Sequence, residues 1–532
     1  MKETARGVTS SVCFLFASPA GGMNVSAKYF VIAGSLAKFF TRFLELSMAA
    51  IYLLSPVLLG LVAHRAPLAQ RAVVPARTSL LHSVAAAPPV HSEPTEAYDE
   101  WTQRLDYPGF RKEVHELGQR LSNEQGEADV KHLQRMILWS NLCGGVGIAT
   151  MWMSSPFGRL LSIVGLSTWT CTRWTMVGHH ICHGGYNRQD TDELKGRYTA
   201  NGFAVGTVYR RVRDWLDWML PEAWHVEHNN LHHYRLGESG DPDLVERNLE
   251  MMRDIPLPRP LKYVAVAFLA AMWKWYYYAP NTYKQLKIAQ MRKDGAVIDE
   301  QEAHEAFTLP HVLFSPTLAA KWNTGPLDFI KRVMGPMLLC RFLLLPAPLA
   351  LLRPSLYGVA MANLLLADVL SNIHSFIIIA TNHCGDDMYK FDNSIVPRSG
   401  SFYMRAVTSS SNFRTANGVG KPVHGFTADL NDFLHGWLNY QIEHHAWPQL
   451  SMLSYQKAAP ELRAICQKYG VPYVQQNVFQ RLKKTADIMV GATSMRPFPA
   501  SWEYVPDRFT WADQRSAAQP EVAAAAVTAG KD

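Results

Sequence analysis

Two pairs of long apolar stretches dominate the hydrophobic pattern of the chain. The first pair covers residues 136–155 and 157–177, separated by a single proline, and the second covers residues 333–352 and 356–380. Each stretch approaches the roughly 20 apolar residues that cross the hydrocarbon core of a bilayer. The pattern predicts four transmembrane helices in two hairpins, and hence an all-α integral membrane protein.

The third of these stretches contains a charged residue, Arg341, and three prolines, Pro336, Pro346 and Pro348. An arginine at the centre of a span costs about 2.5–3.5 kcal/mol on insertion scales. We therefore expect Arg341 to face protein or water rather than lipid.

A fifth apolar stretch, residues 263–278, contains Lys274 and a run of Trp and Tyr. If it crossed the membrane, the histidine-rich segments before and after it would lie on opposite sides. We therefore place it in the membrane interface, where Trp and Tyr concentrate. The tight hairpin turns carry only Arg159 and Arg353, whereas the histidine-rich segments carry many basic residues. By the positive-inside tendency, a helical cap containing the histidines faces the cytosol or a plastid stroma.

The composition agrees with a membrane protein. Of the 532 residues, 48% are apolar and 18% are charged, against about 25% charged residues in an average soluble protein. The net charge is +7, but the basic residues lie beside apolar segments, which indicates a membrane surface rather than a nucleic-acid partner. The seven cysteines form no CxxC pair, which argues against a disulfide framework and a zinc ribbon.

The two ends of the chain do not resemble the rest. Residues 1–92 contain a short apolar run after Met48 and then an arginine-containing, acid-free segment. This pattern indicates either a signal peptide followed by a transit peptide or a signal anchor, and Met48 is a candidate start. We assign residues 98–501 to the catalytic unit. Residues 516–532 lack hydrophobic periodicity and are predicted to be disordered.

Histidines cluster at three places, the first being residues 179–183. On a helix, His179 and His183 lie one turn apart on the same face, so both imidazoles can reach one metal ion, while His180 points elsewhere. An interfacial histidine pair is the alternative interpretation of this first box.

The second box, residues 225–233, contains His228, His232 and His233. We expect His228 and His232 to share a helical face, with His233 beside it. His225 is either a ligand or a residue that supports one. Glu227 and Asn229 are candidates for orienting the imidazole rings.

The third box, residues 441–445, contains Gln441, His444 and His445. A further candidate, His383, follows the last predicted span on the same side of the membrane, which favours a role as a ligand. His374 lies deeper in that span and is expected to be a buried hydrogen-bonding group.

The histidines are too numerous for one metal ion with an open position, but they fit two. Imidazole sites suit iron, copper, zinc or nickel. Soluble ferritin-like di-iron bundles need a Glu-x-x-His motif on each of two helices, and here only Glu222 to His225 has that spacing. Two irons beside apolar spans indicate oxygen activation next to a hydrocarbon chain, because no side-chain acid or base removes hydrogen from an unactivated methylene.

The boxes follow the order HxxxH, HxxxHH and QxxHH, and the third stands in the context Leu-Asn-Tyr-Gln-Ile-Glu-His-His-Ala-Trp-Pro. This pattern resembles the membrane fatty acid desaturase superfamily over residues 130–475, and its third box is similar to that of front-end and sphingolipid desaturases. The resemblance implies an acyl desaturase that uses O2 and two external electrons, with Gln441 at the catalytic site. It also implies that two iron ions are bound by His179, His183, His228, His232, His233, His383, His444 and His445.

Two departures from that family's pattern bear on the reaction and the electron donor. Three residues separate His228 from His232, where desaturases usually have two and related hydroxylases often have three. A hydroxylase acting on an acyl chain, sphingoid base or carotenoid is therefore the nearest alternative. The sequence has no His-Pro-Gly-Gly haem motif, so we expect a separate donor, either ferredoxin in a plastid membrane or cytochrome b5 in the endoplasmic reticulum.

Two further expectations concern the substrate and a rival class of function. Trp273, Trp275 and Tyr276 are candidates for lining an acyl tunnel, although anchoring in the interface would explain the same aromatic residues. The alternative from another class is a non-catalytic membrane protein that binds a structural zinc or a lipid.

Overall fold

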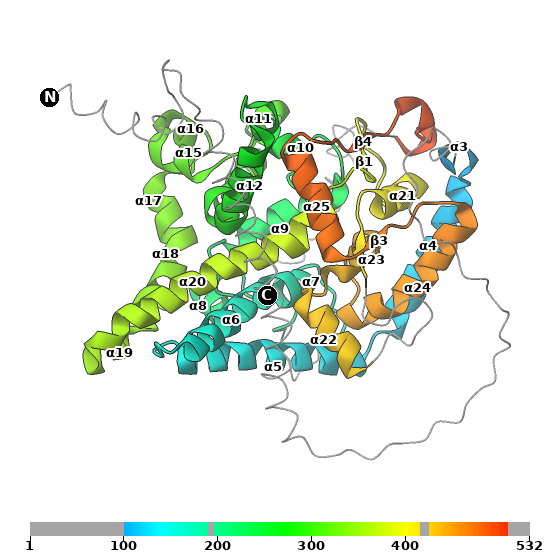
Figure 1. Ribbon diagram of the computed structural model, residues 1–532. Coiled ribbons are helices and arrows are strands. Elements are labelled where there is room, and N and C mark those ends of the chain that lie inside the picture. The colour runs from blue at the N-terminus through cyan, green and yellow to red at the C-terminus, as the bar shows by residue number, and fades with distance from the viewer. Residues whose placement is uncertain (1–100, 190–195, 415–424, 509–532) are drawn as a thin grey trace, which may run out of the picture.

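The computed structural model describes residues 101–189, 196–414 and 425–508 (Figure 1). The predicted targeting region, residues 1–92, and the predicted tail, residues 516–532, lie outside this part of the chain. Helices make up most of it, and its only strands are four short segments. The described part therefore agrees with an all-α fold.

The segment up to the first box is helical. Its helices are α3 (Trp101–Arg104), α4 (Tyr107–Glu124), α5 (Glu127–Thr150), α6 (Pro156–Thr172), the π-helix η2 (Arg173–Gly178) and α7 (His179–Cys182). Ser155 caps α6 by accepting a hydrogen bond from the backbone N–H of Gly158 (3.3 Å), and Pro156 occupies the first helical turn, where its missing N–H costs nothing.

Helices α5 and α6 pack closely because glycines line their contact. A Cβ on Gly147 would lie 2.7 Å from the backbone nitrogen of Leu166, and one on Gly165 would lie 2.6 Å from the carbonyl oxygen of Cys143. Small residues let two helix backbones approach each other in this way. Helix α20 packs on the same α6, as Figure 1 shows.

The middle of the chain holds the second box and the predicted interfacial stretch. Its elements are α8 (Val208–Asp214), α9 (Pro221–Asn230), the 3-10 helix η3 (His232–Tyr234), α10 (Val245–Asn248), α11 (Glu250–Asp254), α12 (Arg259–Trp273), the π-helix η4 (Lys274–Tyr278), α13 (Ala279–Lys293), α14 (Glu300–His304), α15 (Leu309–Phe314) and α16 (Pro316–Lys321). Helix α12 packs on α20. The ammonium group of Lys274 lies 3.1 Å from a carboxylate oxygen of Asp217, and both side chains are fully buried. The charge of Lys274 is thus compensated inside the protein.

The third predicted span is a helix with repeated irregularities. It comprises α17 (Pro326–Phe329), the π-helix η5 (Ile330–Met334), α18 (Gly335–Met337), the π-helix η6 (Leu338–Leu344) and α19 (Ala347–Leu352). Prolines inside the segment remove backbone hydrogen bonds, which accounts for its departure from regular α-helix. Arg341 is buried, with a guanidinium nitrogen 2.9 Å from a carboxylate oxygen of Asp368, so the prediction that it avoids lipid is confirmed.

Two helices in the described residues are long and apolar enough to cross a membrane, Pro326–Leu352 and Pro354–Asn382. They coincide with the second predicted pair of spans. The first pair is a helical hairpin as predicted, but Arg135 in α5 and Arg159 and Arg173 in the α6–η2 helix lower its mean hydropathy. Two of the four predicted spans are therefore long and apolar enough to cross a membrane.

The C-terminal part returns to the histidine region. Its elements are α20 (Pro354–Ile379), η7 (Ala380–Asn382), β1 (Tyr389–Lys390), α21 (Gly400–Thr408), β2 (Asn412–Phe413), α22 (Phe426–Leu434), η8 (Leu438–Tyr440), α23 (Gln441–Ala446), α24 (Met452–Tyr469), β3 (Gln475–Gln476), α25 (Val478–Met489), β4 (Arg496–Pro497), η9 (Ala500–Trp502) and η10 (Val505–Asp507). Strand β1 pairs with β4 and β2 pairs with β3, both in parallel. These two pairings tie the chain after α20 to the C-terminal helices.

Adding a methyl group at the α5–α6 contact should destabilise the protein. Gly147→Ala places a Cβ against backbone, and overpacking of this kind costs about 1–3 kcal/mol. Gly145→Ala is the matched control in the same helix, because a Cβ there meets nothing within 4 Å. Thermal unfolding in detergent should show a lower Tm for Gly147→Ala and an equal or higher Tm for Gly145→Ala. Equal Tm values for the two variants would contradict the close helix contact.

Candidate metal centre

The first box lies where α6, η2 and α7 run as one continuous helix. Ring nitrogen Nδ1 of His179 lies 3.2 Å from the carbonyl oxygen of Thr175. A carbonyl only accepts hydrogen bonds, so Nδ1 carries the proton and Nε2 keeps its lone pair for a metal. His180 makes the same kind of contact with the carbonyl of Met176 (2.6 Å).

The second box spans the end of a helix. Helix α9 ends at Asn230, and His232 and His233 lie in the following 3-10 turn. The predicted helical face shared by His228 and His232 does not form, because the helix stops between them, although the two rings still lie 5.1 Å apart. The change of helix type brings His233 to His228, with their Nε2 atoms 3.3 Å apart.

The third box lies on α23, which a buried carboxylate holds in place. Glu443 accepts hydrogen bonds from the side chains of Asn412 (2.8 Å) and Tyr473 (2.7 Å), and the amide oxygen of Asn412 accepts from the backbone N–H of Ile442 (3.0 Å). Asn412 belongs to β2, and Tyr473 comes just before β3. The short β2–β3 pairing therefore positions α23 through Glu443, and His444 is the residue that follows Glu443 on this helix.

His383 directly follows η7 at the end of α20. Its ring centre lies 4.8 Å from those of both His232 and His445. The last predicted span therefore delivers His383 to the second and third boxes, as the sequence predicts.

The histidines form two groups of converging donors. Within each group, one ligand atom of each residue lies within 4.8 Å of those of the others. The larger group contains His179, His183, His228, His233 and His444, and the smaller contains His232, His383 and His445. These are the eight histidines predicted as ligands, and all but His183 are buried. The Nε2 atom of His228 is 2.9 Å from that of His179, and the Nε2 atom of His233 is 3.2 Å from that of His444.

Burial decides the protonation of these rings. It lowers the pKa of seven of them, to about 3 for His383 and well below the usual value for His179, His183, His228, His233, His444 and His445. These imidazoles are therefore neutral near pH 7, the form that binds metal. Burial also opposes protonation of His232, but the charges of Asp241 and Asp243 and a hydrogen bond to Asp241 outweigh it and raise the pKa of His232.

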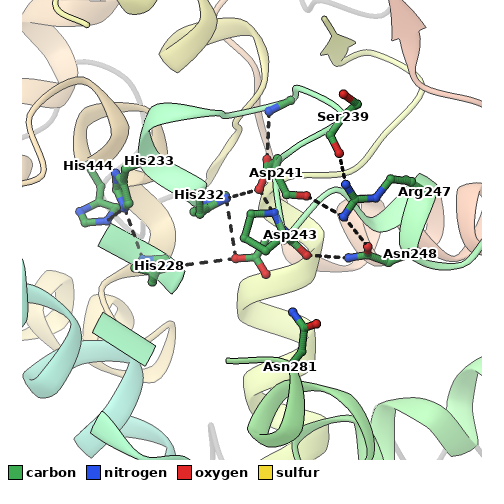
Figure 2. A network of polar contacts seen from close by, with 12 residues as sticks. His228, His232, His233, Ser239, Asp241, Asp243, Arg247, Asn248, Asn281 and His444 are labelled. Atoms are coloured by element: carbon green, nitrogen blue, oxygen red, sulfur yellow. Dashed lines mark hydrogen bonds and ion pairs between the residues drawn. The ribbon is translucent and has the colours of Figure 1, made fainter. Parts of the chain in front are cut away.

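Two aspartates beside the second box were not predicted from the sequence (Figure 2). Asp241 accepts a hydrogen bond from Nδ1 of His232 (2.8 Å), and Asp243 lies 3.7 Å from the same nitrogen and 3.9 Å from Nδ1 of His228. The backbone N–H of Gly237, a residue with φ +74°, donates to Asp241 (2.9 Å). With His228 and His232, Asp243 makes a third set of donors that could hold a metal ion. The sequence signal was the Asp-Pro-Asp tripeptide soon after the box.

A profile of the fatty acid desaturase family matches residues 150–477, which contain all eight histidines. The chain belongs to the fatty acid desaturase family. This confirms the resemblance drawn from the three boxes.

Curated relatives are similar in sequence to the chain over a short segment. The chain is 35% identical to a fatty acid desaturase 2-like protein of Mus musculus over 70 residues, which are 12% of this chain and 14% of that protein. It is 34% identical over 70 residues to a delta(8)-fatty-acid desaturase of Euglena gracilis, with 10% of this chain and 17% of that protein covered. It is 32% identical over 68 residues to fatty acid desaturase 3 of Bos taurus, with shares of 12% and 15%. The chain thus spans less than a fifth of the length of the curated relatives it matches.

The donor set of the chain forms two groups of imidazoles that could each hold a metal ion. Five imidazoles surround one position and three surround the other, and neutral imidazole suits iron, copper, zinc and nickel. Cys182, next to His183 in sequence, stays outside both groups, and burial raises the pKa of its thiol to about 12. No thiolate joins either group in the described part of the chain.

Other residues singled out from the sequence have different surroundings. His180 and His225 belong to neither group, and Nε2 of His374 contacts the carbonyl oxygen of Leu434 at 2.9 Å, as expected of a buried hydrogen-bonding residue. Asn229 donates to the carbonyl of Cys182 (2.9 Å), and the carboxylate of Glu227 has no hydrogen bond within the described residues. The prediction that these two orient imidazoles is therefore wrong, and Asp241 has that role for His232.

The structure also gives the surroundings of Gln441 and of two tryptophans of the predicted tunnel, Trp273 and Trp275. Gln441 opens α23, with its side-chain oxygen buried and without a hydrogen bond among the described residues. Trp273 donates to the carbonyl of Asn372 (2.9 Å), and the ring centre of Trp275 lies 5.7 Å from that of Trp218. These contacts fix both tryptophans, and their role in lining a tunnel stays a prediction.

Removing the charge of Asp241 should weaken metal binding. Asp241→Asn keeps the shape of the side chain but loses the carboxylate that holds the ring of His232, and changes of this kind typically cost about 10–100-fold in metal affinity. Competition with a chelator measures the affinity. The matched control is Asp254→Asn, at an exposed position at the end of α11. Equal affinities for the two variants would show that Asp241 does not support a ligand.

Proposed function

We propose that this family member is an O2-dependent fatty acyl desaturase with two iron ions. The observation that carries the proposal is the convergence of eight histidines, seven of them buried, from all three boxes and from the end of α20, into two groups. In this proposal His179, His183, His228, His233 and His444 hold one iron, and His232, His383 and His445 hold the other.

The chemistry of the substrate favours iron over zinc. Bound iron, together with O2, would supply the oxidising power to break C–H bonds of unactivated methylenes, which no side-chain acid or base can do. The residues of the chain hold and orient the donors: Thr175 fixes the ring of His179, and Asp241 fixes that of His232. Gln441 is proposed to act at the site, which is consistent with its buried and unpaired side-chain oxygen.

The proposed substrate is a lipid-linked acyl chain, and the electrons are proposed to come from a separate donor. Among the relatives, one is named a delta(8)-fatty-acid desaturase, which agrees with a front-end type of third box. No His-Pro-Gly-Gly motif occurs in the 532 residues, which supports ferredoxin or cytochrome b5 as external donor.

We also propose that residues 98–501 form the catalytic domain of an integral membrane protein with four spans. The two apolar helices of the second hairpin support this, as does the helical hairpin of α5 and α6. The histidine groups would face the cytosol or the stroma, and the membrane would be that of a plastid or of the endoplasmic reticulum.

A hydroxylase of the same family is the second candidate, because three residues separate His228 from His232. Of these three residues, Leu231 lies between α9 and η3, and both histidines still join a donor group. The longer spacing is therefore compatible with a complete ligand set, and the product decides between the two reactions.

Metal analysis tests the centre directly. Purified protein should contain two irons per chain, because eight imidazoles form two donor groups. Protein that holds one zinc and no iron would refute the desaturase and would favour a non-catalytic metal-binding function.

Product analysis in a host without desaturases tests the reaction. The wild-type chain should produce a new double bond, and His445→Ala should abolish it, because His445 is one of only three donors in its group. His225→Ala is the matched control, since His225 lies in the second box but outside both groups. A hydroxylated product without a double bond would establish the hydroxylase, and an active His445→Ala variant would refute the assignment of that ligand.

A further inference from the structure

A small cavity lies against both histidine groups. Its volume is about 10 Å³, and its walls include His233 of the larger group and His445 of the smaller. Glu238, Arg405 and Ala406 line it as well. A space of this size holds about one water molecule, provided that polar groups surround it.

One wall of the cavity is a buried ion pair. Arg405, on α21, donates to Glu238 (2.8 Å), and the hydroxyl of Ser394 donates to the other carboxylate oxygen of Glu238 (2.8 Å). A second carboxylate, Glu503, lies 3.5 Å from Arg405. Nitrogen Nε of Arg405 is buried and has no hydrogen-bond partner within the described residues. An unpaired buried donor of this kind is costly unless water satisfies it.

The cavity is also lined by imidazoles with ring nitrogens that lack partners in the described residues. The Nε2 atom of His233 faces His228 and His444 inside the larger group, so its Nδ1 atom lies on the far side of the ring. Nδ1 of His233 and both ring nitrogens of His445 are buried without hydrogen bonds in the described part of the chain. A metal-bound imidazole nearly always donates its other N–H to a carboxylate, a carbonyl or a water.

We propose that one buried water occupies this cavity and links the Glu238–Arg405 pair to His233 and His445. The inference rests on the proposed assignment of these histidines as iron ligands. The water accepts the N–H groups of His233 and His445 and donates to Glu238, whose carboxylate is held in place by Arg405 and Ser394. Glu238 and Arg405 are therefore positioning residues that act on one ligand of each iron.

Two variants distinguish the effect of the water from the effect of the ion pair. Ala406→Val adds two methyl groups to the wall and removes no charge, whereas Glu238→Gln removes the charge and leaves the cavity. Ala458→Val is the control, at a fully buried alanine on α24 that does not line the cavity. The thermal unfolding of each metal-free variant shows whether it folds like the control.

The measurements are the rate of iron release to a chelator and the Mössbauer spectrum of protein loaded with iron-57. Ala406→Val and Glu238→Gln should each release iron about tenfold faster than wild type. Ala406→Val should also shift the signals of both irons, because the cavity touches a ligand of each group, while Ala458→Val shifts neither. Wild-type rates and an unchanged spectrum for a folded Ala406→Val variant would overturn the proposal. Wild-type protein without iron would instead refute the proposed function.

Discussion

The structure depends on keeping seven of eight clustered imidazoles uncharged in one buried volume. Each ring that took up a proton would place a positive charge within a few ångströms of several others, and burial would remove the water that screens it. Seven of the rings respond with a lowered pKa. The eighth, His232, has a raised pKa and has carboxylates beside it. The seven neutral rings therefore present lone pairs to a metal, and on His232 the carboxylate of Asp241 holds a proton on Nδ1 and leaves Nε2 as the donor atom.

The rest of the fold brings distant segments to this volume and neutralises charge around it. The α6–η2–α7 helix, the end of α9, the end of α20 and α23 each deliver part of the donor set. Several charges inside the helical body occur in pairs, such as Lys274 with Asp217 and Arg341 with Asp368. An unpaired charge in such a position would be expensive. Charge is compensated in the same way at the cavity, where Glu238 and Arg405 form an ion pair beside the histidines.

Much of this arrangement could be predicted from the sequence, because local periodicity and spacing determine it. Long apolar runs predicted the hairpin helices, the spacing of the boxes identified seven of the histidines, and the position of His383 after the last predicted span identified the eighth. The end of α9 at Asn230 could not be predicted, because the local sequence is compatible both with a longer α-helix and with a 3-10 turn. The two conformations place His232 differently. Asp241 and Asp243 were missed for a similar reason: they reach His232 through a turn at Gly237, and neither fits a ligand spacing. The contacts of Glu227 and Asn229 depend on tertiary neighbours that no spacing encodes.

X-ray absorption at the iron edge tests the central claim most directly, because it detects both the metal and its neighbours. Eight histidines shared between two ions predict on average about four imidazole nitrogens per iron, with the multiple-scattering pattern of histidine rings and no sulfur neighbour. Sulfur ligands, fewer than two imidazoles per iron, or a protein that binds zinc in place of iron would contradict a histidine-bound di-iron centre.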